Sequence, residues 1–373
     1  MAQYWAHGNQ REGRLNVDKH LLETARLSSI GPPIELTTYS TMLRQPDQQA
    51  TSRPYNRTLC PNPNANRMNL LCATPPFNLQ RGYGTQIEKD NNNEFISLLL
   101  ECLAEKGLTG KSDFVCIRNM LTKLCFTPYE IGGRFDYGMI VVVQKISGVY
   151  YLREFPTDEY TRHEASIEER EKMMRYWGLK FESYVTAKPG AQVPLAAFSD
   201  RLNLNEEFCS VVQTRVGTHS IILRGEIDCC QANGNYVELK TSKEFDHPGH
   251  ERSFYRDKLI KWWLQSSILG IKKVLCGFRD ENGVVKRLEE FSVDQMPSLI
   301  QQKNPSACIN FLDTFLGFVK GNVTSDFVPH VFRRRAGESA FYVSLDGIGQ
   351  YKFIPRWFAE HVAAQSVQAQ YVY

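Results

Sequence analysis

The segment GEIDCCQANGNYVELKTSKE, residues 225–244, carries the clearest local signals in the chain. Its Asn233-Gly234 pair is the strongest short signal for a β-hairpin turn, because both residue types accept positive φ angles. Apolar residues flank the turn, IIL at 221–223 and YV at 236–237. The sequence therefore predicts a buried hairpin at the centre of the protein, around which the other elements are arranged.

Two charged pairs lie on this hairpin, Glu226 with Asp228 and Glu238 with Lys240. Side chains two residues apart on a strand point to the same face, so three carboxylates and one ammonium group converge. Such carboxylates repel one another unless a cation lies between them, and oxygen ligands suit Mg²⁺ or Mn²⁺. The pattern favours a metal-dependent phosphodiesterase, and the alternative is cross-strand ion pairs on a solvated face. If the cluster is repulsive, replacing Glu238 by Ala should abolish activity and leave the fold intact.

Composition restricts the class of protein. The chain has 373 residues, of which 42% are hydrophobic and 23% charged, as in globular proteins of one or two domains. The net charge is only +3, so a nucleic-acid site must be a local groove. We find no apolar run of membrane-spanning length and no secretory signal at the N-terminus, and therefore expect a soluble intracellular protein with reduced cysteines and no membrane partner.

The chain divides into two parts by pattern. Residues 1–90 are rich in Pro, Asn, Gln and Arg, which predicts an extended, partly irregular N-terminal arm. Residues 91–373 are expected to form a single catalytic domain in which strands and helices alternate. The predicted strands are 139–146, 149–155, 209–228, 235–241, 273–278 and 284–293, and the predicted helices include 164–182, 258–269 and 307–318. This order indicates an α+β fold, with a central twisted mixed β-sheet flanked by helices.

Three residues outside the hairpin are candidates for the same site. Glu182, at the end of a helical pattern interrupted by Gly178, would add a fourth carboxylate or would be an exposed helical side chain. Gln265, among tryptophans, is either a satisfied core amide or a donor to a phosphate or water. Arg118, after an apolar strand pattern, would bind a 5′ phosphate or cap the strand with a salt bridge. Gly178 itself predicts a bend or a close approach of another segment.

Several separated motifs, in order, resemble the decapping exoribonuclease (DXO) family of RNA 5′-end quality-control enzymes. The motifs are FVCIR at 114–118 with LTKL at 121–124 and TPYE at 127–130, GLKFE at 178–182, GEID at 225–228, YVELKTSKE at 236–244, RSFY at 252–255 and KLIKWWLQS at 258–266. The resemblance covers the chain from about residue 114 onward and is weaker in the N-terminal arm.

The resemblance implies a fold related to the Asp…Glu-x-Lys nucleases and a site for Mg²⁺ or Mn²⁺, with two ions. The implied metal ligands are the carboxylates of Glu182, Glu226, Asp228 and Glu238 and the backbone carbonyl of Leu239. All four carboxylates are also implied to be catalytic.

The resemblance also implies roles in catalysis and substrate binding. Lys240 and Gln265 would position the attacked phosphate and the water, and Arg118 would bind the 5′-terminal nucleotide. Cys209 corresponds to a position that lines the substrate, and Glu226 would contact substrate as well as metal. One departure is Asn119, which stands where glycine is expected in vertebrate members, so the resemblance does not define the fine shape of the 5′-end pocket.

The implied activity is removal of triphosphate (as pyrophosphate), incomplete caps and NAD caps from RNA, followed by 5′–3′ exoribonuclease degradation. The nucleus is the expected compartment, with the cytoplasm second, and a nuclear exoribonuclease is the expected partner. One alternative is a non-catalytic 5′-end-binding scaffold or an activator of a separate exoribonuclease. Retention of the four carboxylates with Lys240 and Gln265 argues against it. A DNA nuclease on the same fold is a further alternative.

Overall fold

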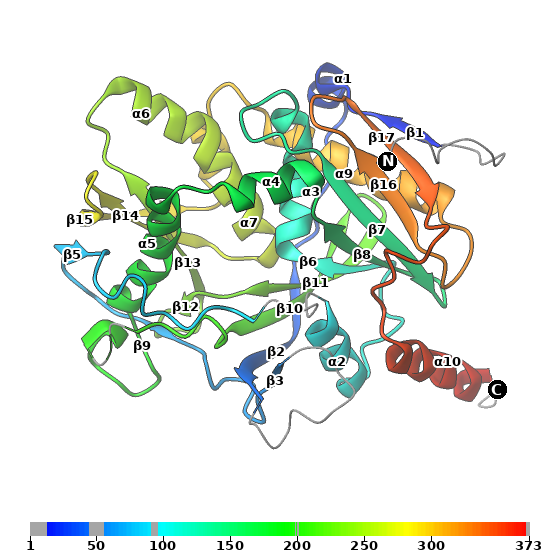
Figure 1. The fold of residues 1–373 in the computed structure, drawn as a ribbon, viewed down its shortest axis with the longest axis horizontal. Helices are drawn as coiled ribbons and strands as arrows, with labels where there is room; N and C mark the ends of the chain where they lie inside the picture. The colour runs from blue at the N-terminus through cyan, green and yellow to red at the C-terminus, as the bar shows by residue number, and fades with distance from the viewer. Residues whose placement is uncertain (1–12, 45–55, 91–95, 198, 200, 371–373) are drawn as a thin grey trace.

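Two mixed β-sheets with surrounding helices form the described part of the protein. The computed structural model describes residues 13–44, 56–90, 96–197, 199 and 201–370 (Figure 1). Within these residues one sheet has ten strands and the other seven. The predicted α+β fold with twisted mixed sheets is confirmed, but the strands are divided between two sheets where one was expected. The expected absence of a signal at the extreme N-terminus concerns residues outside the described ranges.

The larger sheet contains both parallel and antiparallel pairs. Strand β11 is parallel to β6 and antiparallel to β10, which in turn is antiparallel to β2. Its strands, in spatial order, are β1 (Arg14–Asn16), β17 (Ala340–Leu345), β16 (His330–Arg334), β7 (Met139–Ile146), β8 (Val149–Phe155), β6 (Phe114–Ile117), β11 (His219–Glu226), β10 (Phe208–Val216), β2 (Ile34–Leu43) and β3 (Arg57–Leu59).

The smaller sheet contains the predicted hairpin. Its strands, in spatial order, are β5 (Phe77–Asn78), β15 (Val284–Ser292), β14 (Lys273–Arg279), β13 (Tyr236–Lys243), β12 (Cys229–Cys230), β4 (Asn69–Leu70) and β9 (Thr186–Ala187). Strands β12 and β13 pair antiparallel across the 231–235 turn, where the Gln231 amide donates to the Asn235 carbonyl at 2.8 Å and Gly234 has φ +87°. The hairpin prediction is confirmed.

The chain changes sheet inside the GEIDCC segment. Strand β11 ends at Glu226 and strand β12 begins at Cys229, so Ile227 and Asp228 cross between the sheets. The strand-like sequence pattern continues through this crossing. The pattern alone therefore predicts that residues 209–228 all belong to one sheet. The crossing places acidic side chains at the junction of the two sheets.

Helices cover both sheets. They are α1 (Lys19–Thr24), α2 (Ser97–Glu105), α3 (Arg118–Glu130), α4 (Asp158–Ala165), α5 (Glu169–Val185), α6 (Pro248–Ser253), α7 (Leu259–Leu269), α8 (Met296–Leu299), α9 (Pro305–Asn322) and α10 (Arg356–Gln370), with a short 3-10 turn η2 (Leu195–Ala197) and a π-helical turn η3 (Phe254–Lys258). No described helix is long and apolar enough to cross a membrane.

Two helical predictions need correction. The helix expected at 164–182 is two helices, because Glu168 has extended backbone (φ −68°, ψ 152°) between α4 and α5. Helix α5 continues through Gly178, and a Cβ built there would meet nothing within 4 Å, so the expected close approach is wrong. Helix α10 was not predicted.

The larger sheet is buried on both faces, as the continuous apolar runs of its central strands require. Phe114, Cys116 and Leu223 point toward α3, α7 and α9, whereas Val115 and Ile222 point toward α2 and α10. Helix α7 serves both sheets, since Ile260 and Leu264 join the first of these cores and Leu259 and Trp262 join the core of the smaller sheet. It therefore fixes the junction between the sheets.

The described part of residues 1–90 contains strands, turns and helix α1, and it is hydrogen-bonded into both sheets. Strand β1 pairs with β17, β2 with β10, and β5 with β15. A division of the chain at residue 90 stays a prediction.

Candidate active site

The junction of the sheets brings together the charged residues of the hairpin. Glu226 ends β11, Asp228 lies in the crossing, and Glu238 and Lys240 lie on β13. The Leu239 amide donates a hydrogen bond to Asp228 Oδ2 at 2.6 Å, which fixes the crossing against β13. Backbone pairing thus places the two sequence pairs side by side.

Helix α5 brings Glu182 to the same place. Phe181, next to it, packs over β14 at Gly277, where an added Cβ would lie 2.6 Å from the Phe181 ring. Burial, and then the charges of Asp228 and Glu226, raise the pKa of Glu182 well above its ordinary value. Glu182 is half-buried beside the other carboxylates, so it is not the exposed helical side chain of the alternative reading.

The carboxylates of Glu226 and Asp228 also bind protons more tightly than usual. Glu226 reaches the solvent of the cleft but lies deep among protein atoms, where burial and then Glu207 raise its pKa to about 7. Burial, followed by the charge of Glu238, raises the pKa of Asp228 to about 7. These three carboxylates are short of positive charge, which is the electrostatic condition that a bound cation relieves.

Glu238 behaves differently. Its side chain is 1% exposed, and it accepts from Arg118 Nη1 at 2.7 Å and from Lys240 Nζ at 2.6 Å. Burial disfavours its charge, but Arg118 and Lys240 more than offset this and lower the pKa of Glu238 to about 2. The expectation that Glu238 is a repelled carboxylate is therefore wrong, and the effect of its removal on stability stays a prediction.

The carboxylate oxygens at the junction are of the chemical type that binds a divalent cation, but in this structure they do not surround a common point. Within the described residues, no group of three His, Cys, Asp or Glu side chains is placed to hold a metal ion. Hard oxygen donors with raised pKa values suit Mg²⁺ or Mn²⁺. Glu238 can join them while it keeps Arg118 and Lys240, because each carboxylate oxygen has two lone pairs and only one is used. The individual metal ligands, including the Leu239 carbonyl, stay predictions.

The remaining predicted site residues surround this junction. Arg118, at the start of α3, is buried on Glu238, and its Nε has no hydrogen-bond partner within the described part of the chain. Cys209 is fully buried opposite Glu226, and burial raises the pKa of its thiol to about 11. Gln265, on α7, lines a cavity of about 260 Å³ together with Asn119. Their substrate contacts stay predictions.

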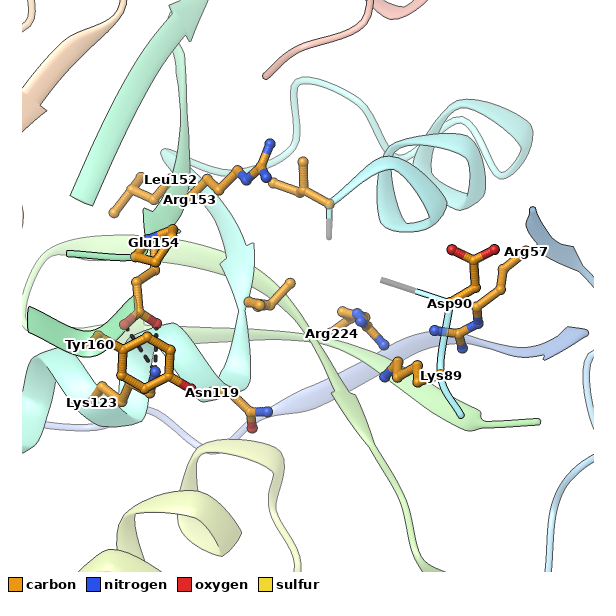
Figure 2. Close-up of a pocket in the computed structure, with 13 residues that line it drawn as sticks. Arg57, Lys89, Asp90, Asn119, Lys123, Leu152, Arg153, Glu154, Tyr160 and Arg224 are labelled. Carbon is orange, nitrogen blue, oxygen red and sulfur yellow. Dashed lines mark hydrogen bonds and ion pairs between the residues drawn. The ribbon is translucent and has the colours of Figure 1, made fainter. Parts of the chain in front are cut away.

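Two larger cavities lie beside the C-terminal end of β11, since Arg224 lines one and Glu226 lines the other. One, of about 510 Å³, is lined by Glu182, Glu226 and Asp228. The other, of about 450 Å³, has basic residues on two sides: Arg57, Lys89 and Arg224 on one, and Lys123 and Arg153 on the other (Figure 2). Lys89 lines both cavities, so they are neighbours along one cleft.

Sequence reasoning missed the basic wall. Arg224 lies two residues before Glu226 on β11, so the strand period alone would place both on one face. Lys89 gave no signal, because it belongs to the irregular N-terminal part and reaches the site only through tertiary contacts.

Comparison with known proteins agrees with this architecture. Residues 32–359 match the family model of the RAI1-like PD-(D/E)XK nucleases. The decapping and exoribonuclease protein of Xenopus laevis is 33% identical over 320 residues, covering 78% of this chain and 77% of the relative.

Solved structures share the fold. Candida albicans Rai1, in complex with pU5 and Mn²⁺, aligns with a TM-score of 0.77 and 22% identity, over 95% of this chain and 100% of that one. Scheffersomyces stipitis Rai1, in complex with (3′-NADP)⁺ and a calcium ion, aligns with a TM-score of 0.75 and 19% identity, over 92% of this chain and 98% of that one. On the family match and the sequence identity, this chain belongs to the RAI1-like PD-(D/E)XK nuclease family.

Proposed function

We propose that this protein is a metal-dependent hydrolase that acts on the 5′ ends of RNA. The observation that carries the proposal is the junction of the sheets, where Glu182, Glu226 and Asp228 have raised pKa values beside a cavity lined by basic side chains. The names of the curated relatives and the pU5 and Mn²⁺ held by Candida Rai1 support this choice of substrate.

The proposed chemistry divides among the residues described. A divalent cation, Mg²⁺ or Mn²⁺ and in our proposal a pair of ions, supplies when bound a Lewis acid for the phosphate and an acidified water. Lys240 would orient a phosphate oxygen, and Gln265 would hold the water or the phosphate from α7. Arg118 would bind the phosphate of the 5′-terminal nucleotide, since a guanidinium donates in a planar fork.

We propose triphosphate, incomplete caps and NAD caps as the groups removed, with 5′–3′ degradation of the RNA afterwards. The 450 Å³ cavity beside the carboxylates has room for a group attached to the 5′ phosphate. The (3′-NADP)⁺ bound to Scheffersomyces Rai1 supports a dinucleotide ligand. We further propose that the protein acts in the nucleus and also in the cytoplasm. We propose that it associates with a separate exoribonuclease.

A single assay tests the reaction. One RNA with four 5′ ends (monophosphate, triphosphate, unmethylated cap and NAD) is incubated with the protein and Mn²⁺, beside an Asp228→Asn variant. Release of pyrophosphate, cap dinucleotide or NAD that is lost in the variant is the expected result, and shortening of the monophosphate RNA would establish the exonuclease step.

A second candidate function is a non-catalytic RNA 5′-end-binding scaffold. It is favoured by the engagement of Glu238 with Arg118 and Lys240, since these two cations already balance the charge of that carboxylate. In the same assay this function predicts RNA binding with no turnover of any 5′ end.

A further inference from the structure

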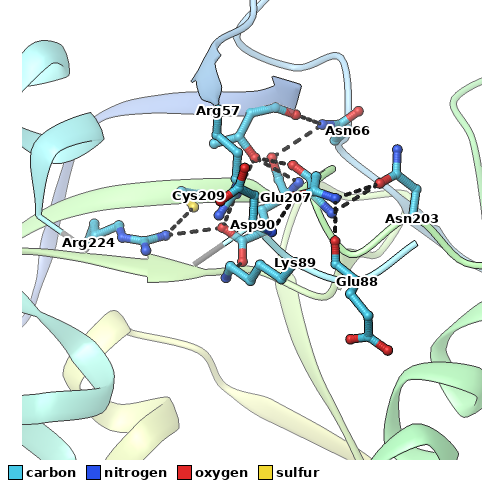
Figure 3. Close-up of polar contacts among 11 residues, drawn as sticks. Arg57, Asn66, Glu88, Lys89, Asp90, Asn203, Glu207, Cys209 and Arg224 are labelled. Carbon is cyan, nitrogen blue, oxygen red and sulfur yellow. Dashed lines mark hydrogen bonds and ion pairs between the residues drawn. The ribbon is translucent and has the colours of Figure 1, made fainter. Parts of the chain in front are cut away.

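A buried carboxylate next to the proposed site gathers three basic side chains. Glu207, 4% exposed, bonds Arg57 Nη2 at 2.7 Å and Lys89 Nζ, and lies 3.4 Å from Arg224 Nη1 (Figure 3). Arg224 also donates to Cys209 Sγ at 3.2 Å. The four side chains come from β3, from the segment before α2, from the residue just before β10 and from β11.

This group carries more positive charge than an ion pair needs. Burial opposes the charge of Glu207, but Arg224, Lys89 and Arg57 more than offset this and lower its pKa. Three cations therefore face one carboxylate, so this group of four side chains is positive by itself. Asp90 lines the same cavity, and the charges of Lys89 and Arg224 also act on the Glu226 carboxylate, so Asp90 and Glu226 offset part of the excess.

Two of the cations are accessible from the cavity. The side chain of Lys89 is 33% exposed and that of Arg224 is 13% exposed, whereas Arg57 is buried. Figure 2 shows Arg224 and Lys89 side by side in the cavity wall. They present donors to a ligand while Glu207 holds them from behind.

The location suits a phosphate adjoining the one that reacts. Arg224 precedes Glu226 by two residues on β11, so the two lie on one face about 7 Å apart along the strand. Both cations are held by Glu207. Their charges also act on the Glu226 carboxylate, so both cations lie within electrostatic reach of the proposed metal site.

We propose that Lys89 and Arg224 bind a phosphate group of the RNA and that Glu207 is the positioning residue that holds them in place. The identity of the ligand rests on the proposed function. A purely structural role for Glu207, linking the N-terminal segment to the sheet, would require one basic partner, and the cluster has three.

Equilibrium binding tests the two contacts without turnover. A labelled short RNA with a 5′ monophosphate is titrated with the full-length protein in Ca²⁺ at several salt concentrations, and the RNA is checked for cleavage. Arg224→Gln and Lys89→Gln are each expected to weaken binding about tenfold and to reduce the slope of log K against log salt by about 0.7, because one phosphate contact is lost.

Arg215→Gln is the matched control. Arg215 is exposed on β10 and lines neither cavity, so this variant removes the same charge from the neighbouring strand and should leave the salt slope unchanged. Salt slopes of Arg224→Gln and Lys89→Gln equal to that of the wild type would overturn the phosphate contacts.

The Glu207→Gln variant distinguishes the positioning of Lys89 and Arg224 by Glu207 from the effect of Glu207 on the overall charge of the cleft. The variant makes the cleft more positive, which by itself would tighten RNA binding. If Glu207 positions the cations, binding instead weakens severalfold. Glu88→Gln, whose side chain points away from the cluster in Figure 3, removes the same charge nearby and should tighten binding slightly or not at all.

The binding experiment and the turnover assay can fail independently of each other. Tighter binding by Glu207→Gln would overturn its positioning role. If that variant does not fold, the slopes of Lys89→Gln and Arg224→Gln decide the proposal. Turnover of the same RNA in Mn²⁺ is measured separately, so a protein that binds through these residues but does not cleave would contradict only the hydrolase function.

Discussion

Arg118 and Glu238 form a buried ion pair in which each residue needs the other. Arg118 is 8% exposed, and its contact at 2.7 Å is with a carboxylate that is itself buried. Removing one member of such a pair leaves an uncompensated charge inside the protein, which costs more than the pair contributes. The same residues are proposed to bind phosphate and metal, so stability and activity are coupled here.

We predict that Glu238→Ala loses both activity and about 3 kcal/mol of unfolding free energy at neutral pH. Urea denaturation of the wild type and the variant measures the second effect. The double variant Arg118→Met with Glu238→Ala, which removes both charges, should recover much of the loss. Equal stability of wild type and Glu238→Ala would show that the ion pair is not formed in solution.

A second buried pair lies away from the cleft and gives a pH dependence. Asp136 bonds Arg334 at 2.8 Å and accepts from the amides of Gly132, Gly138 and Gly337. Burial opposes its charge, but Arg334 and these amides lower the pKa of Asp136 from 3.8 to about 2. Its stabilisation is complete above its unfolded pKa and is lost as the pH falls through about 2.

We therefore predict that Asp136→Asn lowers the unfolding free energy at pH 7, and that the difference from wild type shrinks by about 2 kcal/mol in strong acid. Denaturation at neutral and acidic pH measures it. Glu338→Gln, which changes an exposed partner of Arg335, is the control. A difference that does not vary with pH would contradict the assignment.

Site residues could be predicted from the sequence where their proximity depends only on the geometry of one hairpin. Glu226, Asp228, Glu238 and Lys240 followed from a two-residue period and one turn. Glu207 could not be found this way, because its partners come from strands and loops that are distant in sequence. Nor could the pairing of Glu238, since the position of Arg118 depends on how β6 and α3 pack against β13.

Elements were predicted best where they are regular. Strands β7, β8, β13, β14 and β15 and helix α7 lie close to their expected bounds, since their apolar periods and Gly270 mark them. The division into two sheets was not predictable, because a strand pattern says nothing about which neighbours the strand will pair with. The break between α4 and α5 was missed because residues 166–168 continue the helical composition.

Helix α5 offers a prediction at this scale. Gly178 lies in open space one turn before Glu182, so an added methyl group meets no neighbour. We predict that Gly178→Ala raises the unfolding free energy by about 1 kcal/mol, because alanine favours the helix. Thermal or urea denaturation measures the change.

Gly277→Ala is the contrasting variant on the strand beneath α5. An added Cβ would lie 2.6 Å from the Phe181 ring, so the helix or the ring must shift. It should destabilise the protein by about 1 to 3 kcal/mol. A change of stability in the same direction in both alanine variants would contradict the close packing of Phe181 of α5 on Gly277 of β14.

For the whole molecule, the repelling carboxylates predict a response to metal. Glu182, Glu226 and Asp228 come from separate elements, and a cation bound among them stabilises the folded state by mass action. We predict that Mn²⁺ raises the Tm relative to EDTA and that Asp228→Asn removes most of this rise. Asp294→Asn, an exposed carboxylate paired with Lys272, should retain it. An equal rise in both variants would place the metal elsewhere.

The pairing of the first strands with late ones has a consequence for synthesis of the protein. Among the described strands, β1 pairs with β17 alone, and β5 pairs with β15 alone. While the ribosome is still translating the middle of the chain, these N-terminal segments have no partners to pair with. Both sheets can therefore be completed only after the C-terminal third has been made, and pairing between segments so distant in sequence is slow. Nascent chains stalled before residue 340 would expose unpaired sheet edges and be substrates for chaperones or degradation.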